Sequence, residues 1–257
     1  GADNTSVGAN SLDANTTGAN NTAMGRHALS ANTTGASNVA IGSGALDANT
    51  TANNNIAIGL DALKANTTGT ENVAIGSHTL DANTTASGNT GVGHNSLSAN
   101  TTGSSNTACG AGSLDVNTTG AANTAVGLGS LGANTTANNN TAIGFNSLIL
   151  NTTGTANTAV GQGCLDENTT GSYNVSLGSG ALGKNTTANS NVAVGYGTLG
   201  QNTTGANNTA IGMQALDANT TASNNTAVGQ AALGNSTGSL NVAVGVTSLG
   251  ANTSGAS

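Results

Sequence analysis

A single 17-residue unit repeats along the whole chain and limits what the chain can fold into. Each copy opens on an Asn, from Asn4 and Asn21 to Asn225, so that fourteen copies follow one another without a change of spacing. A fifteenth copy opens one residue early, at Asn241, because the unit before it is one residue short. Such strict self-similarity is typical of a solenoid, in which identical coils stack and each coil contacts only its neighbours. We therefore expect function to be distributed along an array rather than confined to one pocket.

The residues within the unit predict a strand, a corner and a turn. The unit reads Asn, Thr or Val, Ala, Val or Ile, and Gly, with Leu at the ninth place and Asn-Thr-Thr at the twelfth to fourteenth. Alternation over the first four places is typical of a β-strand. The fifth-place Gly is present in all fifteen copies, so we expect a corner with positive φ there. Val or Ile of the fourth place and Leu of the ninth are predicted to form two inward columns, with the second place inward or half-buried.

Composition agrees with this all-β interpretation. Charged residues make up 5% of the chain and aromatic residues 1%, and there is no Pro or Trp, so an ordinary globular core is not available. The regular placement of Val, Ile and Leu argues against disorder, and the 39 Gly argue against helix. We predict a parallel β-solenoid with one coil per 17 residues and about 15 coils. Residues 1–257 are expected to be a single repeat array, an uncapped segment of a longer fibre or a unit of an end-to-end filament.

Self-association is expected because one coil offers little apolar surface. Each unit supplies only two large apolar side chains, whereas ordering its residues removes much conformational entropy. Burying a second face against other copies is the simplest remedy, so we expect a homotrimeric rod. No stretch is apolar and long enough to span a membrane, and we recognise no signal peptide.

The residues that could carry chemistry are scattered over different places of the unit. His27, His78 and His94 occupy variable places and are predicted to be solvated. Cys109 and Cys164 lie at different places three units apart, so we expect buried free thiols rather than a disulfide. We therefore predict no enzyme, no cofactor and no metal. With three basic residues and a net charge of −7, nucleic-acid binding is not expected either.

Aspartate recurs at the tenth place but never in two successive units. Carboxylates stacked at the spacing of neighbouring strands would repel each other, which accounts for the interruptions. A column of calcium sites is the alternative, and the interruptions argue against it. The residues concerned are Asp13, Asp47, Asp81, Asp115, Asp166 and Asp217.

One repeated motif is a candidate functional array. Asn-Thr-Thr, or a Ser variant of it, has the form of an N-glycosylation acceptor in every unit. The alternative is a ladder in which the Asn side chains form hydrogen bonds from coil to coil. Both interpretations concern Asn15, Asn32, Asn49, Asn66, Asn83, Asn100, Asn117, Asn134, Asn151, Asn168, Asn185, Asn202, Asn219, Asn235 and Asn252.

The strand motif resembles that of a known family. Asn38-Val39-Ala40-Ile41-Gly42 and residues 72–76 are similar to the Ser-Val-Ala-Ile-Gly motif of trimeric autotransporter adhesin heads, the YadA-like β-roll. The longer phrase from Asn-Thr-Ala-Val-Gly to Asn-Thr-Thr-Gly is similar to repeats of bacterial and phage tail-fibre-like proteins. The resemblance implies a left-handed, trimeric parallel β-roll, located outside the cell or on a cell or virion surface.

These observations predict a structural component of an extracellular fibre: an adhesin head, a tail-fibre-like protein or a glycan-decorated fibril. Its expected partners are further copies of itself and, where the acceptor motifs are used, glycans. The alternative is an ice-binding β-solenoid, since such proteins present regular Thr columns and Thr-Thr recurs in thirteen of the fifteen coils. Adjacent strand residues point to opposite sides, so only one of the two Thr columns would face out.

Overall fold

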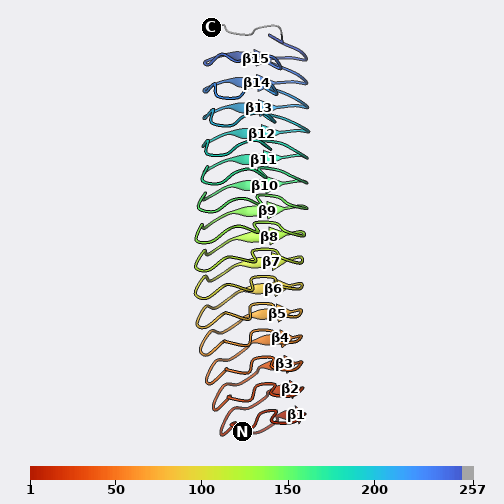
Figure 1. Cartoon of the computed structure of the whole chain (residues 1–257), viewed down its shortest axis with the longest axis vertical. Helices are drawn as coiled ribbons and strands as arrows, with labels where there is room; N and C mark the ends of the chain where they lie inside the picture. The colour runs from red at the N-terminus through yellow and green to blue at the C-terminus, as the bar shows by residue number, and fades with distance from the viewer. Residues whose placement is uncertain (251–257) are drawn as a thin grey trace. The chain divides into compact units, whose positions relative to one another are not determined.

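The computed structural model describes residues 1–250, which contain strands, turns and bends but no helix. Its contacts divide the chain into two compact units, Gly1–Leu128 and Gly129–Ser257. We name these the first and the second unit, and we call each 17-residue repeat a coil. Within each unit, successive coils stack and each coil contributes one short strand, as the coloured ribbon in Figure 1 shows. The predicted parallel β-solenoid with one coil per 17 residues is confirmed.

Every strand is three residues long and covers the second to fourth places of its coil. The strands of the first unit are β1 (Thr5–Val7), β2 (Thr22–Met24), β3 (Val39–Ile41), β4 (Ile56–Ile58), β5 (Val73–Ile75), β6 (Thr90–Val92), β7 (Thr107–Cys109) and β8 (Thr124–Val126). Those of the second unit are β9 (Thr141–Ile143), β10 (Thr158–Val160), β11 (Val175–Leu177), β12 (Val192–Val194), β13 (Thr209–Ile211), β14 (Thr226–Val228) and β15 (Val242–Val244).

Within each unit the strands pair in parallel, in chain order, and equivalent places lie opposite each other. Thr5 pairs with Thr22, 17 residues later, and this register holds from coil to coil. Between β14 and β15 the offset is 16, since Thr226 pairs with Val242. The missing residue of that coil is therefore absorbed outside the strands.

The strands face the opposite way to our prediction. The third-place residue is buried, as at Ala40 and Ala74, whereas the fourth-place residues Ile41 and Ile75 are exposed. The expected inward column of fourth-place Val and Ile is therefore wrong, and second-place side chains lie on the same outward side. The reason is the narrow interior: at Gly91 of the third place even an added Cβ would lie 2.6 Å from Cγ2 of Thr79. In other coils the small side chain of Ala is fully buried at this place, and the larger fourth-place side chain faces out.

The ninth-place Leu forms the inward apolar column, as predicted. From Leu29 to Leu233 these side chains are fully buried. Each of these Leu residues has a positive φ, for example 53° at Leu80 and 51° at Leu182. A left-handed conformation costs a residue with a side chain about 1–2 kcal/mol. It persists here because this backbone conformation directs the large side chain into the coil.

The fifth-place Gly makes the predicted corner. Its φ lies between 126° and 143° in every coil, as at Gly127 and Gly110. The corners of adjacent coils also approach closely, since a Cβ added at Gly42 would lie 2.3 Å from the carbonyl oxygen of Gly59. A side chain is therefore excluded both by the backbone conformation and by the next coil.

The first-place Asn forms a hydrogen-bonded column inside the coils. Oδ1 of Asn21 accepts hydrogen bonds from the backbone N–H and from Nδ2 of Asn38, at 3.0 and 3.2 Å. Nδ2 of Asn38 also donates to the carbonyl of Ala52, at 2.9 Å. The pattern recurs along each unit and satisfies polar groups that would be costly to bury unpaired, although Nδ2 of Asn89 lacks a partner.

Candidate functional site

The twelfth-place Asn, the candidate site of the sequence, forms a second buried column. Nδ2 of Asn32 donates to Oδ1 of Asn15 at 2.9 Å and to the carbonyl of Gly35 at 3.0 Å. The side chain of Asn15 is half-buried, and those of the next twelve residues in the column are fully buried. These twelve are Asn32, Asn49, Asn66, Asn83, Asn100, Asn117, Asn134, Asn151, Asn168, Asn185, Asn202 and Asn219.

The two Asn columns meet at the carbonyl of the fifteenth place. The carbonyl of Ala52 accepts one hydrogen bond from Asn38 of the first column and one from Asn49 of the second. An N-linked glycan replaces one hydrogen of Nδ2, and in residues such as Asn49 both hydrogens are donated inside the wall. The fully buried members of this column therefore have no space for a glycan, and Asn49 has no free N–H to carry one.

The last two candidate positions do not belong to this column as the structure describes it. Asn235 is exposed, and its Nδ2 donates to the carbonyl of Gly250 at 2.8 Å. In the shortened coil, Ser236 takes the twelfth place instead, since its N–H donates to the carbonyl of Leu233 at 3.0 Å and its side chain is buried. Of the two interpretations of Asn235, the structure therefore does not bear out the ladder, and the glycosylation acceptor remains a prediction. Asn252 lies outside the described residues.

The second- and fourth-place side chains of every coil point outward from the strands, and we name the surface that they form the strand face. No residue of any strand is charged. Ile75 and Ile143 are 38% and 39% exposed, and Val, Met or Leu fill the same place in other coils. Contiguous exposed apolar surface without charge is typical of a surface that another molecule covers. The strand face is therefore a candidate interaction surface on both units.

The two cysteines differ in exposure. Cys109 replaces the fourth-place residue and is exposed on the strand face, so its predicted burial is wrong. Cys164 replaces the small eighth-place residue and is buried, as predicted. Burial raises the pKa of the Cys164 thiol. Only Cys109 is therefore open to reagents in the folded chain.

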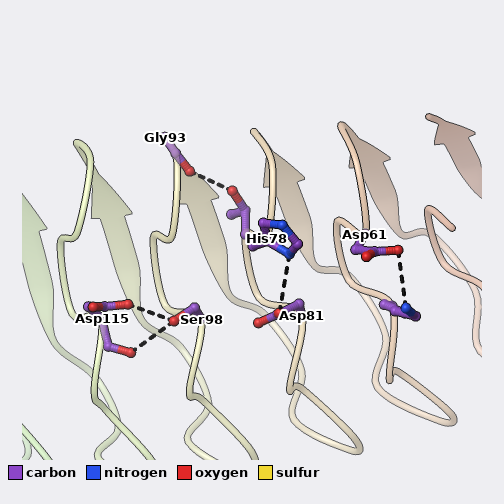
Figure 2. A network of polar contacts seen from close by, with 8 residues as sticks. Asp61, His78, Asp81, Gly93, Ser98 and Asp115 are labelled. Atoms are coloured by element: carbon purple, nitrogen blue, oxygen red, sulfur yellow. Dashed lines mark hydrogen bonds and ion pairs between the residues drawn. The ribbon is translucent and has the colours of Figure 1, made fainter. Parts of the chain in front are cut away.

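Three of the tenth-place Asp residues, Asp47, Asp81 and Asp115, contact a side chain of the same or the preceding coil, as Figure 2 shows for the last two. Ser98 donates to Oδ1 of Asp115 in the next coil, at 2.6 Å, and Ser30 bonds Asp47 in the same way. Lys64 occupies the tenth place of its own coil, and its Nζ lies 3.3 Å from Oδ1 of the seventh-place Asp61. The tenth-place residues that interrupt the Asp series, such as Ser30, Lys64 and Ser98, therefore do more than separate like charges. Each of them places a hydrogen-bond or ion-pair donor beside a carboxylate.

The histidines do not gather into a metal-binding group in the described part of the chain. Nδ1 of His78 lies 3.7 Å from Oδ2 of Asp81, and its ring lies edge-on to that of His94, 6.4 Å away (Figure 2 shows the first pair). Burial raises the pKa of Asp81, and His78 opposes that effect. Among residues 1–250 no group of three His, Cys, Asp or Glu side chains could hold a metal ion.

No family model, curated protein or solved structure matches this chain. Over the same 250 residues there is no helix of the length and apolarity needed to cross a bilayer. Function therefore has to be inferred from the surfaces described above.

Proposed function

We propose that the chain is a structural component of an extracellular fibre, without catalytic activity, whose copies associate through the strand face. The observation that carries the proposal is the uncharged column of exposed Val, Ile, Met and Leu. Leaving such a column in water loses the free energy that its burial would provide, about 25 cal/mol for each Å². A second copy carries the same column at the same spacing from coil to coil, so its own strand face is a matching surface.

The remaining surface supports a passive role. Places six and seven change from coil to coil, while the fifth-place Gly and ninth-place Leu beside them do not. This variation fits a scaffold with a tolerant outer surface. The homotrimer and the location on a cell or virion surface belong to the same proposal and rest on the resemblance of the strand motif to adhesin heads. A glycan coat would use exposed groups, such as the hydroxyls of Thr34 and Thr68 or the amide of Asn235, since the Asn columns are buried.

Sedimentation of the folded chain tests the proposal. The expected mass is a multiple of 24.2 kDa, three times that value for a homotrimer. The double variant Ile41→Lys/Ile75→Lys puts charges on the strand face and should sediment as a monomer with an unchanged β-type circular dichroism spectrum. The matched variant Thr34→Lys/Thr68→Lys puts the same charges at the exposed fourteenth place and should remain associated. A wild-type chain that is monomeric at every concentration would overturn the proposal.

Ice binding remains the second candidate because one Thr column faces out. The fourteenth-place Thr side chains, as at Thr34, Thr51 and Thr68, are exposed. The adjacent thirteenth-place hydroxyls are used within the wall, as where Thr33 donates to the carbonyl of Thr50 at 3.0 Å. Measurement of thermal hysteresis decides this candidate: a freezing-point gap that disappears in Thr51→Lys/Thr68→Lys would support it, and no gap would dismiss it.

A further inference from the structure

A run of glycines hollows one side of the second unit. The seventh and tenth places of successive coils carry no side chain at Gly163, Gly180, Gly183, Gly197 and Gly200. The result is a groove of about 470 Å³, which we name the glycine groove. In the first unit, glycine recurs at the seventh place only in single coils, at Gly44 and Gly112, and the tenth place always carries a side chain, such as Asp81. The groove is therefore a local feature of a few coils in an otherwise uniform wall.

The backbone beneath the glycine groove is already hydrogen-bonded. The N–H of Gly180 donates to the carbonyl of Gln162 at 3.0 Å, and that of Gly197 donates to Ser179 at 3.1 Å. The carbonyls of these two glycines accept from Gly183 and Gly200. Any ligand in the groove must therefore be recognised by the side chains of its walls.

Two half-buried carboxylates mark the length of the groove. Asp166 and Asp217 both line it and lie three coils apart in the sequence pattern. At about 4.8 Å for each coil, that separation is roughly 14 Å. Burial raises the pKa of both groups. Asp217 makes no hydrogen bond or ion pair with any residue in the described part of the chain, so its oxygens are available as acceptors.

An aromatic ring and amides complete the walls. Tyr196 lies between the two carboxylates in the sequence pattern and is 63% exposed. Gln162, Gln201 and Gln214 supply amides that can donate and accept. The cation of Lys184 is paired with Glu167, so the charge of the groove remains negative overall. Anionic ligands are therefore disfavoured.

We propose that the glycine groove binds a short, uncharged oligosaccharide. Hydroxyl groups donate well to carboxylates and exchange hydrogen bonds with amides. The apolar face of a pyranose ring carries weakly positive C–H groups that are attracted to the negative face of an aromatic ring such as Tyr196. A linear saccharide also advances by about one ring over the distance between coils, so successive rings meet equivalent places of successive coils.

A second hollow continues the same path toward the C-terminal coils. It has a volume of about 490 Å³ and shares Gln214 and Asp217 with the glycine groove. Glycines again line it, at Gly234 and Gly250. A longer chain of the same saccharide could therefore extend past Asp217. The proposal does not depend on the fibre, because every residue involved belongs to one chain.

Saturation-transfer NMR with uncharged hexasaccharides tests the groove on the whole chain. The probes are cellohexaose, maltohexaose, mannohexaose and N-acetylchitohexaose, with hexagalacturonate as the anionic probe. We expect at least one uncharged probe to bind with a Kd of about 1 mM or below, and no binding of hexagalacturonate. Tyr196→Ala should weaken binding by about tenfold or more. Absence of binding by all four uncharged probes would overturn the proposal.

Matched variants separate the groove from the rest of the surface. Gly180→Asn should block binding by filling the groove, since a Cβ at this position has no atom within 4 Å and other coils hold Asn at the same place with positive φ. Gly112→Asn makes the same change at an equivalent, open position of the first unit and should leave binding intact. Tyr173→Ala removes an exposed Tyr that does not line the groove and serves as the control for Tyr196→Ala. Equal binding by the groove variants and their controls would contradict the proposal.

Discussion

Asn49 donates a hydrogen bond of 2.9 Å from Nδ2 to Oδ1 of Asn32, the equivalent residue of the preceding coil. Because each amide is a donor at one atom and an acceptor at the other, the column needs Asn in successive coils, and it links the coils from Asn15 to Asn219. The same donor reaches the carbonyl of Ala52, so each side chain also fixes the turn of its own coil.

Replacing one donor in this column should destabilise the fold. Asn49→Asp keeps the shape but removes both N–H groups and buries a carboxylate against Oδ1 of Asn32 and the carbonyl of Ala52. We expect a loss of about 3 kcal/mol or more at neutral pH, and a smaller loss in acid, where the carboxyl is protonated. Thermal unfolding measures both. Asn53→Asp is the control, because Asn53 is exposed and uses Oδ1 as an acceptor, which Asp retains. Equal melting temperatures for the two variants would show that the column is dispensable.

The corner glycine should not tolerate even a methyl group. In Gly59→Ala the new Cβ would lie 2.5 Å from the carbonyl oxygen of Gly76, at a φ of 136°. We expect a loss of at least about 1–3 kcal/mol in urea or thermal unfolding. Gly88→Asn is the matched control, because only Oγ of Ser105 lies near its Cβ, at 3.9 Å, and Asn occupies the same place with positive φ at Asn54. If the two variants unfold alike, the close approach of the corners does not limit the sequence.

Alkylation of Cys109 should report association through the strand face. In an assembled sample the thiol is expected to react with iodoacetamide at least about tenfold more slowly than in the monomeric Ile41→Lys/Ile75→Lys variant, because a covered thiol cannot meet the reagent. Cys164 is the internal control: it is buried with a raised pKa and should react only after unfolding. A single rate for Cys109 in both samples would place the contact between copies elsewhere.

Stability should rise when the half-buried Asp217 loses its charge. Burial raises the pKa of this carboxyl above its ordinary value of 3.8, so folding favours the protonated form. Its favourable contribution is complete below pH 3.8 and is lost as the pH rises through the folded-state pKa. Asp217→Asn should therefore melt at a higher temperature than wild type at pH 7 and at an equal temperature in strong acid. Asp13→Asn, at an exposed residue, controls for the change in net charge. A variant that melts lower at pH 7 would contradict this sign.

The sequence alone was sufficient to predict the period, the parallel strands, the Leu column and the Gly corner, because each follows from a residue repeated in every unit. It was not sufficient to orient the strand. The rule that large apolar residues face inward favours Ile75 over Ala74, and only the close approach of coils around Ala74 reverses that choice. The first-place Asn column also went unrecognised, although an Asn at that place in all fifteen copies was a usable signal.

The residue types at the seventh and seventeenth places are restricted by backbone conformation more than the variation in the sequence indicates. Seventh- and seventeenth-place residues have positive φ, as at Asn10, His27 and Asn20. The frequent Asn, Gly, Asp and Ser at these places follow from that backbone conformation, which such residues adopt at low cost. The glycine groove could not be predicted, because it depends on glycines at two places lying side by side in successive coils.

The shortened coil has a consequence for how such a gene can change. One residue is missing before Asn241, yet the N–H of Asn241 still donates to Oδ1 of Asn225 at 3.0 Å, and β15 still pairs with β14. A small deletion in the turn is thus contained within one coil and does not shift those that follow. Whole coils present the same donors and acceptors to both neighbours, so unequal recombination between repeats joins one coil to another without a mismatch. A chain with one coil more or one coil fewer would therefore keep the same cross-section.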